Sequence, residues 1–167
     1  MPRAARAKAL LAACAVVAPA AIPSAHAATA SDTMTVTATV VQSCQVVAND
    51  LSFGAYNPIA TTDLDATTTL DVTCTSGTGY IVSMDAGVGS GATIATRKMT
   101  SSGNTLNYSL YRNAARTQVW GQTSGTDTVS GTGTGAVQSL TVYGRAPAAQ
   151  AAPPGSYSDT VTVTVTY

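Results

Sequence analysis

The sequence lacks most of the side chains that enzymes use for catalysis. It contains no Glu, and its single histidine, His26, lies close to the N-terminus. Histidine is the commonest general base and a member of the usual nucleophilic triads, and glutamate is one of its main alternatives. We therefore predict that the chain is not an enzyme and that it uses no cofactor.

Charged residues are also scarce, at 10% of the chain, and all eight acidic residues are Asp. Three of the eight basic residues, Arg3, Arg6 and Lys8, lie at the N-terminus. If that segment is removed, five basic residues remain against eight acidic ones, which gives a net charge of −3. A nucleic-acid-binding protein needs a basic patch, so this balance argues against nucleic acid as a partner.

No apolar run is long enough for a transmembrane helix. The longest one, Ala9 to about Ile22, follows the three basic residues and precedes an A-x-A site at residues 25–27. This layout predicts a signal peptide at residues 1–27 that is cleaved after about Ala27, and hence export from the cytoplasm.

A lipobox is an alternative explanation of the same segment. Leu11-Ala12-Ala13-Cys14 resembles one, and Cys14 would then be the lipidated first residue of the exported chain. Against this alternative, the apolar stretch before Cys14 is very short and continues past it.

Two cysteines, Cys44 and Cys74, remain after cleavage at residue 27. In an exported chain they are expected to form a structural disulfide. Chain-entropy reasoning gives such a bridge a stabilisation of about 3 to 4 kcal/mol. A metal site is not expected, because two cysteines without histidine are a poor ligand set for zinc.

The chain after Ala28 has the pattern of an all-β protein. Apolar residues alternate with polar ones, and Thr, Val, Tyr and Gly recur where a helix would favour Ala, Leu, Glu and Lys. The expected strands are 33–41, 43–47, 51–56, 67–75, 79–85, 106–110, 117–121, 138–144 and 156–167. Residues 122–135 are nearly all Thr, Ser and Gly, which predicts a loop or a loosely held hairpin. Short strands separated by frequent turns indicate an immunoglobulin-like sandwich.

The first expected strand, 33–41, has two distinct faces and no charge on either. One face carries Met34, Val36, Ala38 and Val40, and the other carries four threonines. A strand needs a partner for its backbone donors and acceptors, so this segment must complete either its own sheet or that of another molecule. The last expected strand, 156–167, places six alternating residues on one face: Tyr157, Asp159, Val161, Val163, Val165 and Tyr167.

Three further motifs have weaker functional interpretations. Asp63-Leu64-Asp65 is the only close acidic pair and could touch a cation, but a solvated turn is the favoured interpretation because no calcium-loop spacing surrounds it. Arg97 and Lys98 are adjacent, so on a strand they should point in opposite directions and form no anion patch. Trp120, the only Trp, is expected in the core.

Four sequence blocks occur in a specific order along the chain. They are LSFG at 51–54, Cys74 followed by Gly79-Tyr80, LNYSLYRNAART at 106–117, and PGSYSDTV at 154–161. These blocks resemble the spore coat protein U (SCPU) domain, the subunit family of archaic, Csu-type chaperone-usher pili. The resemblance spans essentially the whole exported chain and implies an incomplete immunoglobulin-like β-sandwich that is completed by donor-strand exchange.

The resemblance also implies a set of partners. In that family a periplasmic chaperone first lends a strand to the open groove, and at the outer-membrane usher the N-terminal segment of the next subunit replaces it. The implied parts are a signal peptide at 1–27, a donor-strand segment at 28–41 and a sandwich domain at 42–167. The donor residues would be Met34, Val36, Ala38 and Val40, and the acceptor groove edge and chaperone contact would be Val161, Val163, Val165 and Tyr167.

The implied function is that of a structural subunit of a secreted surface fibre, exported through the periplasm to the cell surface and serving adhesion and biofilm formation. A spore-coat or surface-layer protein of the same family is an alternative. A small outer-membrane β-barrel is another, since the C-terminal pattern resembles a barrel-insertion strand, but aromatic residues make up only 5% of the chain. A closed sandwich that binds carbohydrate through its Thr- and Gly-rich loops also stays open.

Overall fold

The computed structural model describes residues 26–167. Residues 1–25, which include Cys14 and most of the expected signal peptide, lie outside this range, so the signal-peptide and lipobox predictions are not addressed by it. The chain divides into two units, residues 1–38 and Thr39–Tyr167. Among the described residues, no helix is long and apolar enough to cross a membrane.

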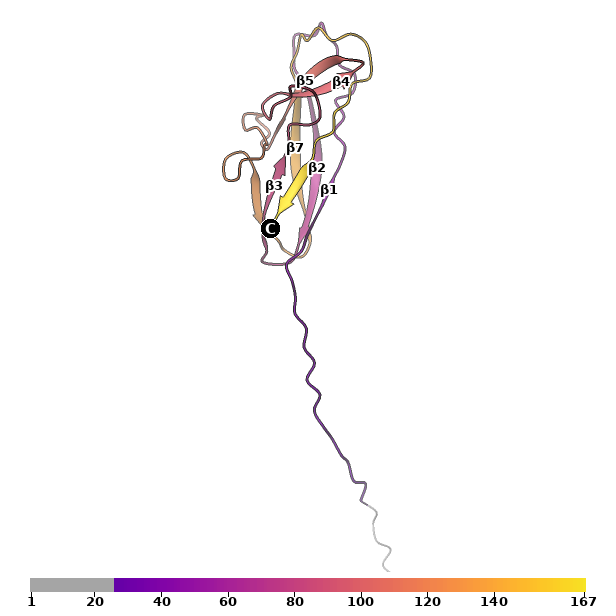
Figure 1. Ribbon diagram of the computed structural model, residues 1–167, viewed down its shortest axis with the longest axis vertical. Helices are drawn as coiled ribbons and strands as arrows, with labels where there is room; N and C mark the ends of the chain where they lie inside the picture. The colour runs from indigo at the N-terminus through magenta and orange to yellow at the C-terminus, as the bar shows by residue number, and fades with distance from the viewer. Residues whose placement is uncertain (1–25) are drawn as a thin grey trace, which may run out of the picture. The chain divides into compact units, whose positions relative to one another are not determined.

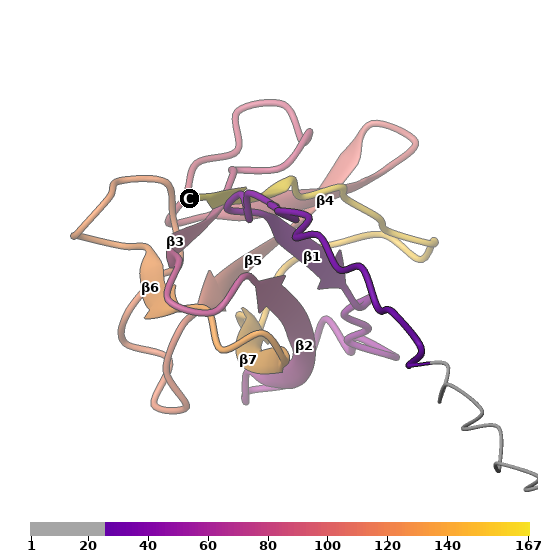
Figure 2. The same cartoon turned by 90° about the horizontal axis from the view of Figure 1, so that it is seen from below.

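Residues 39–167 fold into two antiparallel sheets (Figure 1). The strands are β1 (Cys44–Ala48), β2 (Leu64–Cys74), β3 (Gly79–Met84), β4 (Arg97–Ser101), β5 (Asn104–Tyr111), β6 (Val129–Thr132), β7 (Val137–Ala146) and β8 (Val163–Thr166). The larger sheet has the order β1-β2-β7-β5-β4, and the smaller one has the order β6-β3-β8. Figure 2 views both sheets from the end at which the C-terminus lies.

The core lies between the two sheets because each strand buries the apolar side of its alternating pattern. The buried apolar side chains are Leu70, Val72, Cys74, Tyr80, Val82, Met84, Tyr108, Leu110, Trp120, Val142 and Ala146. Trp120 is 1% exposed, and its indole N–H donates to the carbonyl of Val82, which confirms its expected place in the core. The all-β sandwich predicted from the sequence is likewise confirmed.

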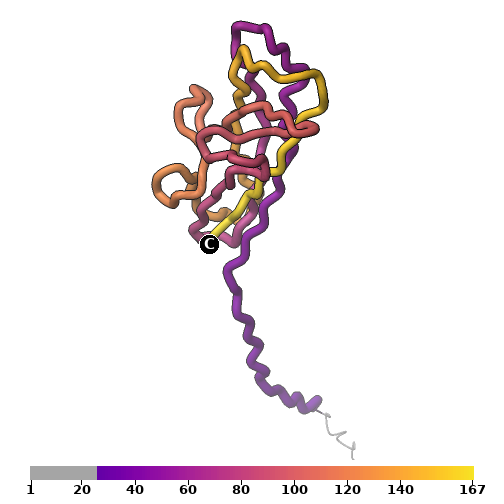
Figure 3. Tube along the Cα trace, turned by 45° about the horizontal axis from the view of Figure 1, so that its top comes forward, coloured from indigo at the N-terminus to yellow at the C-terminus, as the bar shows by residue number. Residues whose placement is uncertain are grey.

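The strand register defines two ends of the sandwich. One end, which we call the loop pole, contains residues 49–63 and 147–158, joined where the Tyr56 hydroxyl donates to the Pro147 carbonyl. The other end, the exit pole, contains residues 41–43, 75–78, 133–136 and Tyr167, joined by backbone hydrogen bonds from Thr75 to Ser43 and from Gly77 to Gly133. The last segment of the chain runs from the loop pole to the exit pole (Figure 3).

Several expected strands differ from the observed ones. Residues 33–41 pair with no strand of the described chain. Of the expected strand 156–167, Val163–Thr166 forms β8, and Ser158 makes an isolated bridge to Thr100 of β4. Part of the expected loop 122–135 is strand β6, so that prediction was too simple. The reason is local pairing: Val129 lies opposite Val82, and the Tyr80 ring covers the position where a side chain on Gly131 would stand.

Candidate functional site

The sandwich has two neighbouring edges that lack a strand partner among residues 26–167. β1 pairs only with β2, and β8 pairs only with β3. The two strands lie near each other at the open side of the sandwich, one from each sheet. Because a bare edge presents unpaired N–H and C=O groups, this side can accept a further strand.

A cavity of about 470 Å³ opens at this side and exposes part of the core. We call it the edge groove. Its lining includes Ala48 at the end of β1, Val161 just before β8, Val163 at the start of β8, and the buried Leu70 and Met84. The whole lining comprises Ala48, Asn49, Asp50, Leu51, Phe53, Thr68, Leu70, Met84, Met99, Tyr108, Leu110, Val142, Tyr157, Ser158, Asp159, Thr160, Val161 and Val163. A cleft lined this way suits apolar side chains from an extended segment.

Three of the four residues expected at the acceptor edge lie together along β8. Val161, Val163 and Val165 are half-buried and pack against the core, and the first two line the edge groove. Tyr167 lies at the exit pole and is 56% exposed. Their role in accepting a donor strand or a chaperone stays a prediction.

The segment that leads into β8 is held by two carboxylates and by a few backbone hydrogen bonds, which pair Ser158 with Thr100 and join the Asp85 N–H to the Thr162 carbonyl. Asp85 accepts hydrogen bonds from the backbone N–H groups of Gly87 and Thr162, each at 2.9 Å. Burial disfavours its charged form, but these bonds, a bond from the Thr162 side chain and the nearby Arg97 prevail and lower its pKa. The start of β8 is therefore fastened to the end of β3.

Asp159 provides the second fastening. Its carboxylate accepts from the Val88 and Thr160 N–H groups and from the Tyr108 hydroxyl at 2.7 Å. Burial and the adjacent Asp159 carboxylate raise the pKa of Tyr108, so the phenol remains a proton donor. Gly87 has a φ of 80°, and a Cβ there would meet the Asp159 carboxylate at 2.1 Å, so this approach requires glycine.

Arg97 ties three loops together behind this segment. It is 0% exposed, and its guanidinium donates to the carbonyl oxygens of Asp85 at 2.8 Å, Ile94 at 3.0 Å, Met84 at 3.4 Å and Trp120 at 2.7 Å. Burial lowers its pKa, although nearby acidic groups partly oppose this effect. Arg97 is thus a structural cation.

Sequence reasoning missed this role. It correctly placed Arg97 and Lys98 on opposite sides of a strand, since Lys98 reaches the Ser90 carbonyl instead, but it gave Arg97 no importance. It likewise gave Asp159 no role. The available indication was an aspartate among the apolar residues on one face of 156–167, because a charge on a core-facing side needs a fixed partner.

The cysteines behave as predicted. Cys44 and Cys74 lie opposite each other in the β1–β2 ladder and are joined by a disulfide. β1 is one wall of the edge groove and pairs on one side only, so the bridge fixes its position at the exit pole.

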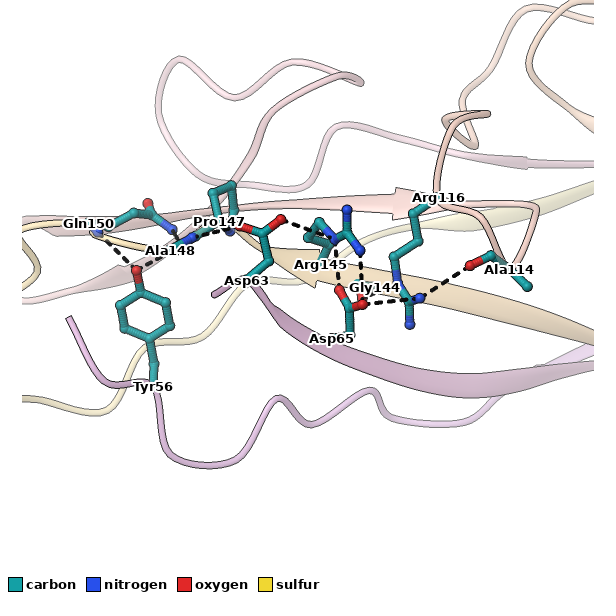
Figure 4. Close-up of polar contacts among 10 residues, drawn as sticks. All are labelled: Tyr56, Asp63, Asp65, Ala114, Arg116, Gly144, Arg145, Pro147, Ala148 and Gln150. Atoms are coloured by element: carbon teal, nitrogen blue, oxygen red, sulfur yellow. Dashed lines mark hydrogen bonds and ion pairs between the residues drawn. The ribbon is translucent and has the colours of Figure 1, made fainter. Parts of the chain in front are cut away.

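The acidic pair is not a solvated turn, so that interpretation was wrong. Figure 4 shows Asp65 bound by Arg145 through two bonds of 2.8 and 2.9 Å and by Arg116 at 3.2 Å. Asp63 contacts Arg145 at 3.5 Å and accepts from the Ala148 N–H. The hydrogen bond from Arg145 leads the effects that lower the pKa of Asp65. Residues 26–167 contain no group of three or more His, Cys, Asp or Glu side chains suited to a metal ion.

The expected donor residues are highly exposed. Met34, Val36 and Val40 are 85%, 79% and 84% exposed, and Ala38 is also exposed. Large apolar side chains that alternate along an unpaired segment are uncommon on a soluble surface unless they bind something. Their role as a donor strand stays a prediction.

This chain is similar to known proteins in sequence and in fold. The family model of the Spore Coat Protein U domain matches residues 30–164. Protein U of Myxococcus xanthus is 34% identical over 158 residues, which covers 86% of this chain and 88% of that protein. The chaperone–tip adhesion subunit pre-assembly complex CsuC–CsuE, from the archaic chaperone-usher Csu pili of Acinetobacter baumannii, contains a chain with a similar fold. The TM-score is 0.59 at 24% identity, over 77% of this chain and 40% of that one.

Proposed function

Because the chain belongs to the spore coat protein U domain family, we propose that it is a structural subunit of a secreted surface fibre, an archaic chaperone-usher pilus, that polymerises by donor-strand exchange. The edge groove between β1 and β8 is the observation that carries this proposal. The same chain offers an apolar, unpaired segment to fill it. The fibre would serve adhesion and biofilm formation.

In this mechanism Met34, Val36, Ala38 and Val40 of one subunit enter the edge groove of the next. Their spacing of two places all four side chains on one face of a strand, and the Thr face stays in water. Burial of the three larger side chains is worth about 5 to 8 kcal/mol before ladder hydrogen bonds are counted. The free edge of β8 supplies those hydrogen bonds.

An exposed apolar groove needs a cover before assembly. The solved structure with the similar fold is a complex of a subunit with its chaperone. We propose that a periplasmic chaperone covers the edge of this subunit along Val161, Val163, Val165 and Tyr167, and that an outer-membrane usher directs the exchange. Residues 1–27 would act as the cleaved signal, residues 28–41 as the donor segment and residues 42–167 as the acceptor domain.

A coat or surface layer is the second candidate product. The family description, Spore Coat Protein U domain, favours it. Donor-strand exchange would operate in the same way in either assembly, so the edge groove does not distinguish between them.

A matched pair of substitutions tests donor-strand exchange. Val36→Asp places a charge in an apolar groove, at a cost of several kcal/mol, whereas Thr37→Asp changes the wet face and should be nearly silent. Each variant is expressed with chaperone and usher, and the chaperone complex and surface polymer are measured separately.

We expect Val36→Asp to lose the polymer and keep the chaperone complex, because the acceptor domain is unchanged. Thr37→Asp should keep both. If Val36→Asp loses the complex and the polymer equally, the segment belongs to its own domain and the proposal is wrong.

A further inference from the structure

A second cavity, of about 590 Å³, lies at the loop pole. We call it the pole pocket. Its lining includes Ala55, Tyr56, Pro58, Pro153 and Tyr157. Leu51, Phe53, Met99 and Tyr157 also line the edge groove, so the two cavities adjoin.

The pole pocket presents polar and apolar surface in about equal parts, and its two tyrosine hydroxyls already have partners. The Tyr56 hydroxyl donates to the Pro147 carbonyl and accepts from the Gln150 N–H. The Tyr157 hydroxyl donates to the Pro153 carbonyl. Its aromatic rings and prolines can contact apolar side chains, and its backbone and serine groups can contact polar ones. Ile59, which follows the lining residue Pro58, is 86% exposed.

The orientation of a donor strand determines what reaches this pocket. Every strand pair in the sandwich is antiparallel, and β3 pairs antiparallel with both β6 and β8. A donor that continues this pattern runs antiparallel to β8, so its C-terminal end lies beside Val163, where β8 begins. This is the end of β8 that faces the loop pole, because Val163 pairs with Met84 and Thr166 with Ile81.

The donor segment is joined to its own domain by very little chain. Val41, Gln42 and Ser43 separate Val40 from Cys44, the first residue of β1. Four residue steps span at most about 14 Å. The exit pole of the donating copy must therefore lie against the loop pole of the accepting copy.

Residues 41–44, which connect the donor segment to β1 at the exit pole, are also held in place by hydrogen bonds and the disulfide. The Thr75 hydroxyl accepts from the Ser43 N–H at 3.1 Å and approaches the carbonyl oxygens of Ser43 and Val41 at 3.3 and 3.5 Å. The Thr75 N–H donates to the Ser43 carbonyl, and the adjacent disulfide fixes Cys44. This pole exposes apolar side chains of its own, Val41 at 71% and Tyr167 at 56%.

We propose that the pole pocket is a docking site for the exit pole of a second copy of this chain, with the residues around Val41 as its contact. This inference rests on donor-strand exchange and adds a second contact, between the two domains, at each joint. The joint between subunits is then a fixed contact between two domains as well as an inserted strand.

Photocrosslinking in the assembled polymer tests the contact. A benzophenone amino acid in place of Ala55, an exposed residue of the pole pocket, should form a covalent dimer whose linked peptide contains residues 41–43. The same probe in place of Val163 should link to residues 34–40, which tests donor-strand exchange alone. The probe in place of Thr141, which is exposed on β7, is the control and should form no such dimer. No dimer from the Ala55 position, or a link to any segment outside the exit pole, would overturn the inference.

A charge variant provides the second measurement. Ala55→Asp should leave uptake of a synthetic peptide of residues 28–40 by the chaperone-held subunit unchanged, because this peptide ends before the first residue of the exit pole. Uptake of a whole second subunit should fall about tenfold. A charge that loses its water on docking costs at least about 1.4 kcal/mol, and this free energy corresponds to a tenfold weaker affinity. If Ala55→Asp and the wild type take up whole subunits equally well, the docking of the exit pole in the pole pocket is contradicted. Failure of the wild type to take up the peptide would instead contradict donor-strand exchange.

Discussion

Replacement of the buried arginine provides the sharpest test of how the fold is held. Arg97→Met removes the donors to four carbonyl oxygens, two of them at 2.7 and 2.8 Å. Hydrogen bonds to a charged group contribute about 1.5 to 3 kcal/mol each, but deletion of the charge also removes its desolvation penalty. We therefore expect a net loss of about 3 to 5 kcal/mol. Arg97→Lys keeps the charge with fewer donors in a different geometry, and should lose about 2 to 3 kcal/mol.

Urea unfolding of the purified chain, followed by the fluorescence of the single Trp120, measures both losses. Lys98→Met is the matched control, because that side chain makes one long bond of 3.4 Å, and we expect a change within about 0.5 kcal/mol. If Arg97→Met stays within about 1 kcal/mol of wild type, the carbonyl contacts do not hold the loops. If Arg97→Lys has the same free energy of unfolding as the wild type, a positive charge alone is sufficient, and the planar arrangement of the guanidinium donors is not needed.

Two further predictions concern the bridge and the ion pairs. Replacing both Cys44 and Cys74 with Ala should lower the free energy of unfolding by about 3 to 4 kcal/mol, and two free thiols in mass spectra of the non-reduced wild type would contradict this. The lowered pKa of Asp65 means that its contribution to stability is present above its unfolded pKa, near 3.8, and is lost as the pH falls through the lowered folded value. Asp65→Asn should therefore reduce the loss of free energy of unfolding as the pH falls below about 4. An unchanged loss at acid pH would count against the ion pair.

The fold was largely predictable because its strands follow simple alternation. Leu70, Val72 and Cys74 share one face in the sequence and are buried together on β2. Strand β6 was not predictable in this way, since its residues VSGT have little apolar character. Its pairing depends on β3, and in particular on the Tyr80 ring over Gly131, which no local pattern reveals.

The candidate site was predictable in part. Val161, Val163 and Val165 alternate in the sequence and are all half-buried against the core, whereas their use as an acceptor edge stays a prediction. The fastening of that edge by Asp85, Asp159 and Arg97 was not predictable, because it joins residues from three distant parts of the chain. Alternation shows which face is buried, but it does not show which loop carbonyls a buried cation will meet.

The arginines of the described chain share one structural use. Besides Arg97, Arg112 donates to the carbonyls of Thr126 and Thr128, Arg116 to that of Gly144, and Arg145 binds Asp65. Each holds a loop or strand end in place, so little positive charge is left for recognition. The lining of the edge groove contains no Lys or Arg, and the segment 33–41 carries no charge. Association of such surfaces depends on burial rather than on long-range attraction, and screening by salt should therefore affect it little.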